Sequence, residues 1–267
     1  MLHILNNENI KKKIFYTKKS IYSIISIVII IFGSFWYYNN ISWKKNYNQG
    51  LLNIKNGNYE EAIKFFDKTI NTNPNCSNAY IDKGIALNAL TNYQQAIKSY
   101  DTALLIDNTN IRIFISKAKT LYLMKKYEDS IIECDIGLKL KKHSNLYNIK
   151  GASLATLGEY NEAIENYNKA IEQNPNYFDP HQNKFCPLFK LGRYKEALES
   201  INKAIELEPK HSKIDIMYTN KASALNKLGC YEEAIEACNI ALALNPKNEN
   251  AINAKNQALE LLKCKEL

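Results

Sequence analysis

The heptapeptide GEYNEAI at residues 158–164 decides the fold, because the same phrase returns along most of the 267-residue chain. Close copies are GNYEEAI at 57–63, GRYKEAL at 192–198 and GCYEEAI at 229–235, and weaker copies are TNYQQAI at 91–97 and KKYEDSI at 125–131. The successive tyrosines are spaced 34, 34, 33, 34 and 37 residues apart. A period near 34 residues is typical of stacked helical hairpins.

Small residues recur at fixed places around this phrase. The middle of each first helix holds Gly50, Gly84, Ala118, Gly151 and Ala222, with Phe185 in the fifth copy. Each second helix holds Ala62, Ala96, Ser130, Ala163, Ala197 or Ala234, and seven residues later Thr69, Ala103, Gly137, Ala170, Ala204 or Ala241. Closely crossing helices need small side chains at the crossing. Larger residues then fill the remaining space, namely Phe66, Tyr100, Cys134, Tyr167, Ile201 and Cys238. The cysteines among them are predicted to be buried.

This pattern resembles the tetratricopeptide repeat (TPR) family. The resemblance implies an all-α fold, a right-handed α-solenoid of six helical hairpins over residues 44–248. The repeats lie at about 43–76, 77–110, 111–143, 144–177, 178–211 and 215–248. Proline closes four of them, at Pro74, Pro175, Pro209 and Pro246. Residues 249–267 are expected to form a C-terminal capping helix, because the end of such a stack needs a polar cover.

The fifth repeat departs from the pattern. Pro187 falls inside its first helix, where proline is expected to cause a kink. The junction at 210–214 is also longer than the others. Together these features predict a bend or a softer seam over residues 178–214, with neutral drift in a tolerant array as the alternative.

Most of the net positive charge lies at the N-terminal end of the chain. The net charge is +8, and residues 1–45 carry seven lysines against one acid, Glu8. Residues 1–19 are therefore interpreted as a basic N-terminal tail. The repeats are nearly neutral, which argues against a nucleic-acid-binding face.

Residues 20–43 contain no charge and are predicted to form a transmembrane signal anchor. The lysines that precede this segment predict a cytoplasmic N-terminus with the repeats outside the cytoplasm, as in a single-pass protein of a bacterial inner membrane. Two alternatives stay open. The segment could be a cleaved signal peptide, although no small-residue cleavage site follows it, or it could be a buried core helix.

The sequence offers little catalytic chemistry. It has no P-loop, GxSxG, HExxH or CxxC motif, and its four histidines lack neighbouring ligands at metal-site spacing. We therefore expect no enzyme activity, no cofactor, no metal site and no small-molecule substrate.

A lysine precedes the small residue of the first helix in five repeats: Lys83, Lys117, Lys150, Lys184 and Lys221. These side chains are predicted to pack their aliphatic stems along the hairpin with the ammonium groups in water. A basic ladder for an acidic partner is the alternative.

The family resemblance implies that the first helices line a groove that holds a protein or peptide partner. The groove candidates in repeats one to three are Tyr47, Leu51, Ile54, Ile81, Ile85, Asn88, Ile115, Lys119 and Tyr122. The matching positions further on are Asn148, Ala152, Ala155, Gln182, Cys186, Phe189, Thr219, Ser223 and Asn226. A chaperone-tail clamp is not expected, because only Arg112 matches its basic set.

The sequence therefore predicts a noncatalytic, membrane-anchored scaffold that recruits or assembles protein partners close to the bilayer. Three alternatives stay open: a receptor or cochaperone with its repeats in the cytosol, a subunit that tethers an enzyme, and an effector secreted after signal cleavage.

Overall fold

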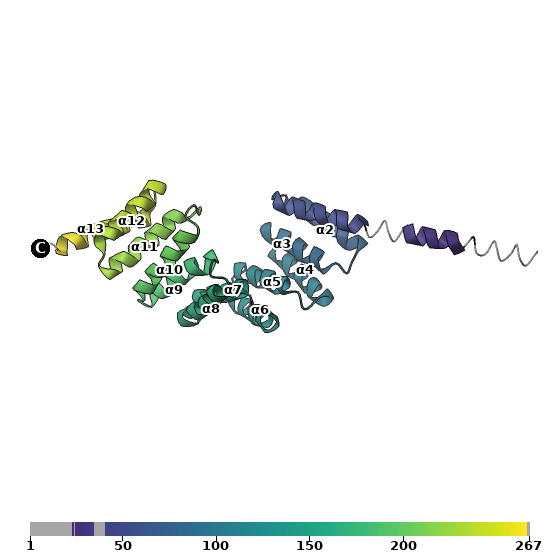
Figure 1. Ribbon diagram of the computed structural model, residues 1–267, viewed down its shortest axis with the longest axis horizontal. Helices are drawn as coiled ribbons and strands as arrows, with labels where there is room; N and C mark the ends of the chain where they lie inside the picture. Colours follow the sequence, from purple (N-terminus) through teal and green to yellow (C-terminus); the bar gives the residue numbers. More distant parts are fainter. Residues whose placement is uncertain (1–22, 24, 35–40, 266–267) are drawn as a thin grey trace, which may run out of the picture. The chain divides into compact units, whose positions relative to one another are not determined.

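The computed structural model describes residues 23, 25–34 and 41–265, which form helices and no strands. The chain divides into two compact units, Met1–Ile106 and Asp107–Leu267. Each unit is built from helices that pack against their neighbours in sequence (Figure 1).

The first unit contains two hairpins. Residues 41–55 are helical and are followed by α2 (Tyr59–Thr72), α3 (Ser77–Ala89) and α4 (Tyr93–Ile106). Helix α3 packs against both α2 and α4.

The second unit contains nine helices among its described residues. These are α5 (Ile111–Leu123), α6 (Tyr127–Leu140), α7 (Ser144–Leu157), α8 (Tyr160–Gln173), α9 (Phe178–Lys190), α10 (Tyr194–Leu207), α11 (Ile214–Leu228), α12 (Tyr231–Leu244) and α13 (Glu249–Lys265). The odd-numbered helices also pack in turn, α7 on α5, α9 on α7, α11 on α9 and α13 on α11. This row of first helices carries both cavities described below.

Each second helix buries one narrow face. In α8 the buried residues Ala163, Tyr167 and Ala170 follow a spacing of four and three, which places them on one side of the helix. The same spacing recurs with Ala62, Phe66 and Thr69 in α2. A small residue before and after one large side chain allows the neighbouring helices to approach on both sides.

The large residue of the second helix fits against the small residue of the first. A β-carbon at Gly151 would lie 2.8 Å from the Tyr167 ring, and one at Gly84 would overlap the Tyr100 ring. In every repeat the two residues are 16 positions apart. Where the first helix has alanine, as at Ala118 and Ala222, the residue 16 positions later is a cysteine. The pairs are Gly50/Phe66, Gly84/Tyr100, Ala118/Cys134, Gly151/Tyr167, Phe185/Ile201 and Ala222/Cys238.

Burial follows this pairing. Cys134 and Cys238 are fully buried, which confirms their prediction as small apolar residues. Burial raises the pKa of the Cys134 thiol to about 12, so it stays protonated near neutral pH.

The repeated phrase also sets the turn inside each hairpin. Its glycines adopt the left-handed backbone region, with φ of 76° at Gly57 and 88° at Gly158. In the two weaker copies Thr91 (φ 62°) and Lys125 (φ 61°) take the same conformation. The turn therefore persists where glycine is lost, although a β-branched residue is strained in that region.

Three of the recurrent lysines make ion pairs, which the sequence analysis did not predict. Lys83 pairs with Asp67 at 2.5 Å, Lys117 with Glu133 at 2.7 Å and Lys150 with Asp135 at 2.5 Å. Each pair joins a first helix to the second helix of its own or the preceding hairpin. Lys184 instead donates to the amide oxygen of Asn168 at 3.1 Å.

The bend or softer seam over residues 178–214 stays a prediction, and the structure shows how this region packs. Helix α9 continues through Pro187 to Lys190. Phe178, Leu188 and Met217 belong to one buried cluster that joins α9, α10 and α11. Pro187 lies in the last turn of α9 and lacks the backbone donor that would bond the Asn183 carbonyl. The extra junction residues are anchored by stacking of the His211 ring on Phe178 at a centroid distance of 4.8 Å.

The predicted anchor over 20–43 falls partly outside the described residues, since residues 20–22, 24 and 35–40 are not among them. Residues 25–34 are helical. Within the part of the chain that the structure describes, no helix is both long and apolar enough to cross a membrane.

The crossing pair predicts a measurable coupling. Gly84→Ala is expected to lower the free energy of unfolding by about 1–2 kcal/mol, because the new methyl group meets the Tyr100 ring. Tyr100→Cys alone should cost about 3 kcal/mol by leaving a cavity. The double variant recreates the Ala/Cys pair of the third repeat and should be more stable than the sum of the two changes by at least about 1 kcal/mol. Urea unfolding of the four proteins measures this coupling.

The control combines Gly84→Ala with Cys238→Ala, which belong to different repeats and should act additively within about 0.5 kcal/mol. Additivity of the Gly84 and Tyr100 changes would contradict the complementarity of the pair.

Candidate functional site

One cavity of the second unit has a volume of about 630 Å³. We call it the mixed cavity, because apolar, aromatic, amide and charged side chains share its lining. They are Ile115, Lys119, Tyr122, Asn145, Asn148, Ile149, Ala152, Ala155, Thr156, Tyr167, Tyr177, Asp179, Asn183, Cys186 and Pro187. Most come from α5, α7 and α9, and α7 contacts both of the other two helices.

Tyr167 connects this cavity to the core. Its side chain is almost fully buried and packs on the face of Gly151, beside Leu154 and Ala163. Burial raises the pKa of the Tyr167 phenol far above its usual range, and the nearby Tyr122 and Cys186 raise it further. The phenol is therefore neutral at any physiological pH.

A chain of polar groups forms the side of the mixed cavity toward α9. The Asn183 amide donates to Asn148 Oδ1 at 3.2 Å, and Asn148 Nδ2 donates to the Tyr177 hydroxyl at 3.4 Å. Burial and the neighbouring carboxylate of Asp179 raise the pKa of the Tyr177 phenol. These contacts orient two asparagines that lie on adjacent first helices, α7 and α9.

The mixed cavity carries one basic and one acidic side chain. Lys119 is exposed on α5 and makes no ion pair with the described residues, whereas Asp179 is exposed at the start of α9. Since α7 lies between these helices, the cavity presents opposite charges on its two flanks. Such an arrangement can select the orientation of a bound chain.

The groove candidates divide between the two units. Ile115, Lys119 and Tyr122 all line the mixed cavity, together with Asn148, Ala152, Ala155 and Cys186 from the later repeats. In the first unit Leu51 is exposed, and Ile54, Ile85 and Asn88 are half-buried.

Two candidates of the first unit are used in packing. Ile81 departs from the groove expectation, because its side chain is fully buried and has no surface left for a partner. Tyr47 donates its hydroxyl to the Asp82 carboxylate at 2.6 Å, and its ring packs 5.9 Å from that of Phe66. The repeat pattern could not reveal this contact, because Asp82 has no acidic counterpart in the other repeats.

Sequence reasoning missed several residues of the mixed cavity. The repeat pattern predicts Tyr167 as a packing residue only. Tyr177 precedes α9 and Asp179 lies in its first turn, and both are outside the positions predicted to face the groove. Their order in the chain gives no local signal, since they reach the cavity only when α9 packs beside α7.

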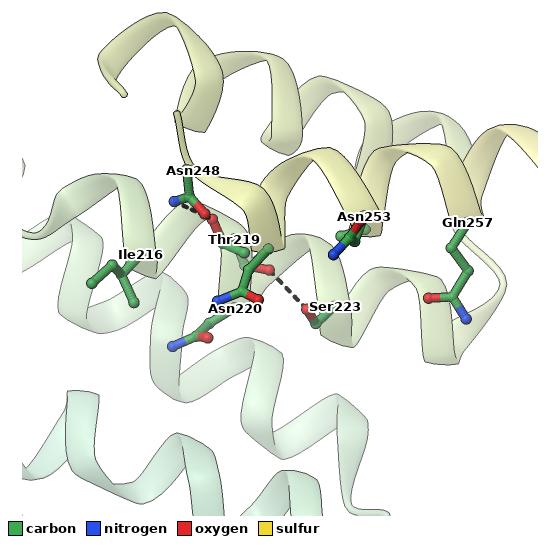
Figure 2. Close-up of a pocket in the computed structure, with 9 residues that line it drawn as sticks. Ile216, Thr219, Asn220, Ser223, Asn248, Asn253 and Gln257 are labelled. Atoms are coloured by element: carbon green, nitrogen blue, oxygen red, sulfur yellow. Dashed lines mark hydrogen bonds between the residues drawn. The ribbon is translucent and has the colours of Figure 1, made fainter. Parts of the chain in front are cut away.

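The second cavity has a volume of about 340 Å³ and lies between α11 and α13 (Figure 2). We call it the amide cavity. Its lining residues are Ile216, Thr219, Asn220, Ser223, Asn248, Asn250, Asn253, Ala254 and Gln257. None of them is ionisable or aromatic.

The described residues contain no group of three or more histidine, cysteine, aspartate or glutamate side chains arranged to hold a metal ion. Their six cysteines are free thiols.

The geometry thus defines an all-α helical-repeat protein with two cavities along its first helices. Family models described as tetratricopeptide repeat match residues 47–110, 144–177, 188–211 and 216–248, which together make up more than half of the chain. The protein belongs to the tetratricopeptide repeat family, as its recurring phrase indicated.

Solved structures agree on the fold. YrrB, a TPR protein with an unusual peptide-binding site, is 21% identical with a TM-score of 0.58, over 72% of this chain and 97% of that one. PilF of Pseudomonas aeruginosa is 16% identical with a TM-score of 0.72, over 82% and 99%. PilW, a type IV pilus biogenesis factor, is 14% identical with a TM-score of 0.71, over 79% and 97%. At such identities the likeness shows the fold alone. No curated protein matches the chain.

A buried histidine at the start of α9 predicts a pH dependence of stability. His181 Nε2–H donates to the Pro175 carbonyl at 3.0 Å, and the carbonyl of His181 accepts from Ser200. Burial lowers the pKa of His181 below its ordinary 6.5, which Lys184 and Lys203 reinforce. As the pH falls below 6.5 the unfolded chain takes up a proton before the folded chain does. The free energy of unfolding therefore decreases until the folded-state pKa is reached.

We expect His181→Gln, which keeps an N–H donor, to show a shallower decrease of stability from about pH 7.5 to about pH 5 than the natural chain. Urea unfolding across this range measures it. Because burial also lowers the pKa of His143, the His143→Gln variant gives the contribution of a second histidine for comparison. An unchanged pH dependence in His181→Gln would contradict this account.

Proposed function

We propose that the protein is a noncatalytic scaffold that binds a peptide segment of a protein partner in the mixed cavity. The observation that carries this proposal is the combination of an open cavity of about 630 Å³ with apolar, amide and charged groups on three adjacent first helices. Ligand sites are concave and largely apolar, with a few placed polar groups. The family supports a role in protein–protein interaction, and YrrB is described as having a peptide-binding site.

The lining suggests how such a segment binds. An apolar side chain would lie against Ile149 and Tyr122, above the buried ring of Tyr167. Asn145 and Asn183 would hydrogen-bond the polar main chain of the segment. Lys119 would favour an acidic residue on the α5 flank, and Asp179 a basic residue on the α9 flank.

We further propose that residues 20–43 anchor this scaffold in a membrane, with the N-terminus in the cytoplasm and the repeats outside it. The support comes from sequence: 24 residues without charge, aromatic residues at their C-terminal end, and five lysines shortly before them. Only residues 39–42 separate the aromatic cluster from the first repeat, so the partner would lie close to the bilayer. PilW, whose description concerns pilus biogenesis, is an example of this fold in an assembly role.

Filling the mixed cavity should abolish peptide binding. Ala152 lines the cavity from α7, and a tryptophan there would occupy part of its volume. Ala152→Trp is therefore expected to weaken, by at least about tenfold, the binding of peptides selected on the natural full chain from a random displayed library. Fluorescence anisotropy measures the affinity. Ala243→Trp, on an exposed position of α12, serves as the matched control and should leave the affinity unchanged.

Lys119→Glu should shift the selected peptides from acidic to basic residues at one position. Failure of the natural chain to enrich any peptide, or equal binding by Ala152→Trp, would contradict the proposal.

The anchor makes a separate prediction. The full chain is expected to sediment with membranes and to resist carbonate extraction. Replacing both Ile27 and Ile30 by lysine should release it, because a charge near the bilayer centre costs about 2.5–3.5 kcal/mol. Lysines at Asn161 and Asn239, exposed positions of α8 and α12, provide the matched control.

The orientation of the repeats relative to the membrane is tested with the variant Asn108→Cys, which places a thiol in the exposed turn before α5. Labelling of this thiol by an impermeant reagent is measured on intact cells. Labelling before permeabilisation would place the repeats outside the cytoplasm. Labelling only afterwards would favour the cytosolic receptor, and carbonate extraction of the natural chain would exclude an anchor.

A further inference from the structure

An apolar ridge runs along the exposed side of the second helix α6. It consists of Ile132, Ile136 and Leu140, which follow one another at a spacing of four and therefore lie on one side of the helix. They are 56%, 42% and 49% exposed, and none of them lines either cavity. We call this surface the α6 ridge. Single exposed apolar residues are common on proteins, whereas a contiguous line of them points to a contact surface.

The ridge is a property of α6 and not of the repeat. Ile132 and Ile136 stand five and nine residues after the tyrosine that begins the helix. Among the second helices of the six repeats, α6 alone is apolar at both positions. The other pairs are Lys64/Lys68 in α2, Lys98/Thr102 in α4, Glu165/Lys169 in α8, Glu199/Lys203 in α10 and Glu236/Ile240 in α12.

The charged residues in the middle of α6 are used inside the array. Glu133 pairs with Lys117 of α5 at 2.7 Å, and Asp135 pairs with Lys150 of α7 at 2.5 Å. These two acids belong to the sides of α6 that meet its neighbours. The exposed side is therefore left to the apolar residues of the ridge.

The two ends of α6 carry opposite charges. Glu128 and Asp129 are exposed in its first turn, seven and eight residues before Ile136. Lys141 and Lys142 are exposed just after its end, five and six residues beyond Ile136. Such a surface is complementary to itself. A second α6 laid antiparallel across Ile136 brings the acids of each copy close to the lysines of the other, whereas a parallel copy would bring like charges together.

We propose that the α6 ridge joins two copies of this chain in an antiparallel, two-fold dimer. Ile136 of one copy lies against Ile136 of the other at the axis, and Ile132 lies against Leu140 of the other copy. The apolar contact supplies the favourable burial, and the charged ends set the antiparallel direction. Because the ridge is small, the dimer is a weak one. The proposal uses neither cavity, so it does not depend on peptide binding.

The mass of the full chain in density-matched detergent micelles tests this proposal by sedimentation equilibrium. The natural chain is expected to be dimeric at about 100 µM. The variant Ile132→Glu/Ile136→Lys gives α6 the pair that α8 carries as Glu165–Lys169 at 2.7 Å, so it should keep its helix content. We expect this variant to dimerise at least about tenfold more weakly. The matched control Ile240→Lys creates the same pair with Glu236 on α12 and should sediment like the natural chain.

Charge reversal tests the antiparallel direction. Glu128→Lys/Asp129→Lys makes both ends of α6 positive and should weaken the dimer at least about tenfold. Adding Lys141→Glu/Lys142→Glu exchanges the two ends completely and should restore dimerisation, because each end again meets its opposite.

Cysteine crosslinking locates the contact. Under mild oxidation by copper phenanthroline, Ile136→Cys is expected to form a disulfide between copies, since the two-fold axis brings its two thiols together. Ile240→Cys, at the same repeat position of α12, should form no more disulfide than the natural chain. The exposed Cys186 and Cys264 of the natural chain give the background.

Three outcomes would overturn the proposal. A natural chain that stays monomeric at about 100 µM would assign the ridge to a different protein. A dimer that persists in Ile132→Glu/Ile136→Lys would place the contact elsewhere in the chain. Equal crosslinking of Ile136→Cys and Ile240→Cys would exclude a two-fold axis at α6.

Discussion

The close crossing of the two helices in each hairpin is the constraint on which the rest of the structure depends. In five of the six hairpins a glycine or alanine in the first helix pairs with a larger residue 16 positions later in the second, as Gly84 faces Tyr100. The volumes compensate: glycine is paired with an aromatic ring and alanine with cysteine. Because close packing tolerates neither a void nor an overlap, this pair sets how near the two helices lie. The distance between the two helices of each hairpin determines how the first helices line up. Both cavities depend on that arrangement.

Much of this helical arrangement could be predicted from the sequence, because the same short motif, and with it the same local structure, recurs six times. The helices, the turn glycines and the buried cysteines all follow from positions that recur at one period. The pairing of volumes could not be seen in that way. Each pair joins two residues that are 16 positions apart in the sequence. Their complementary volumes become evident only when the two helices are seen packed against each other. Similarly, Lys83 pairs with Asp67 and Lys117 with Glu133, and these two acids lie at different positions of their second helices. No single sequence spacing therefore predicts these ion pairs.

Part of the candidate site could also be predicted, because some of its residues lie at recurring positions of the repeat. Ile115, Lys119 and Tyr122 were placed on the exposed side of α5 by counting from the small residue, and they line the mixed cavity. The same count failed for Ile81, which is buried in the first unit. The position of a residue in the repeat predicts which way its side chain points. Whether that side chain is buried depends on the residues around it. Tyr177 and Asp179 could not be found by counting at all, because the N-cap and the first turn of α9 lie outside the recurring positions.

The two cavities differ in how their geometry is maintained. In the mixed cavity Tyr167 is at once the ring that packs on Gly151 and part of the lining, so the packing of the hairpin and the shape of the site are one property. A change that disturbs the crossing there must disturb the cavity. In the amide cavity the frame rests on Asn226 and Asn248, and the amides at the wall contribute nothing to it. Those amides can therefore vary in sequence at little cost to stability. The lining at that end is separable from folding, whereas at α7 it is not.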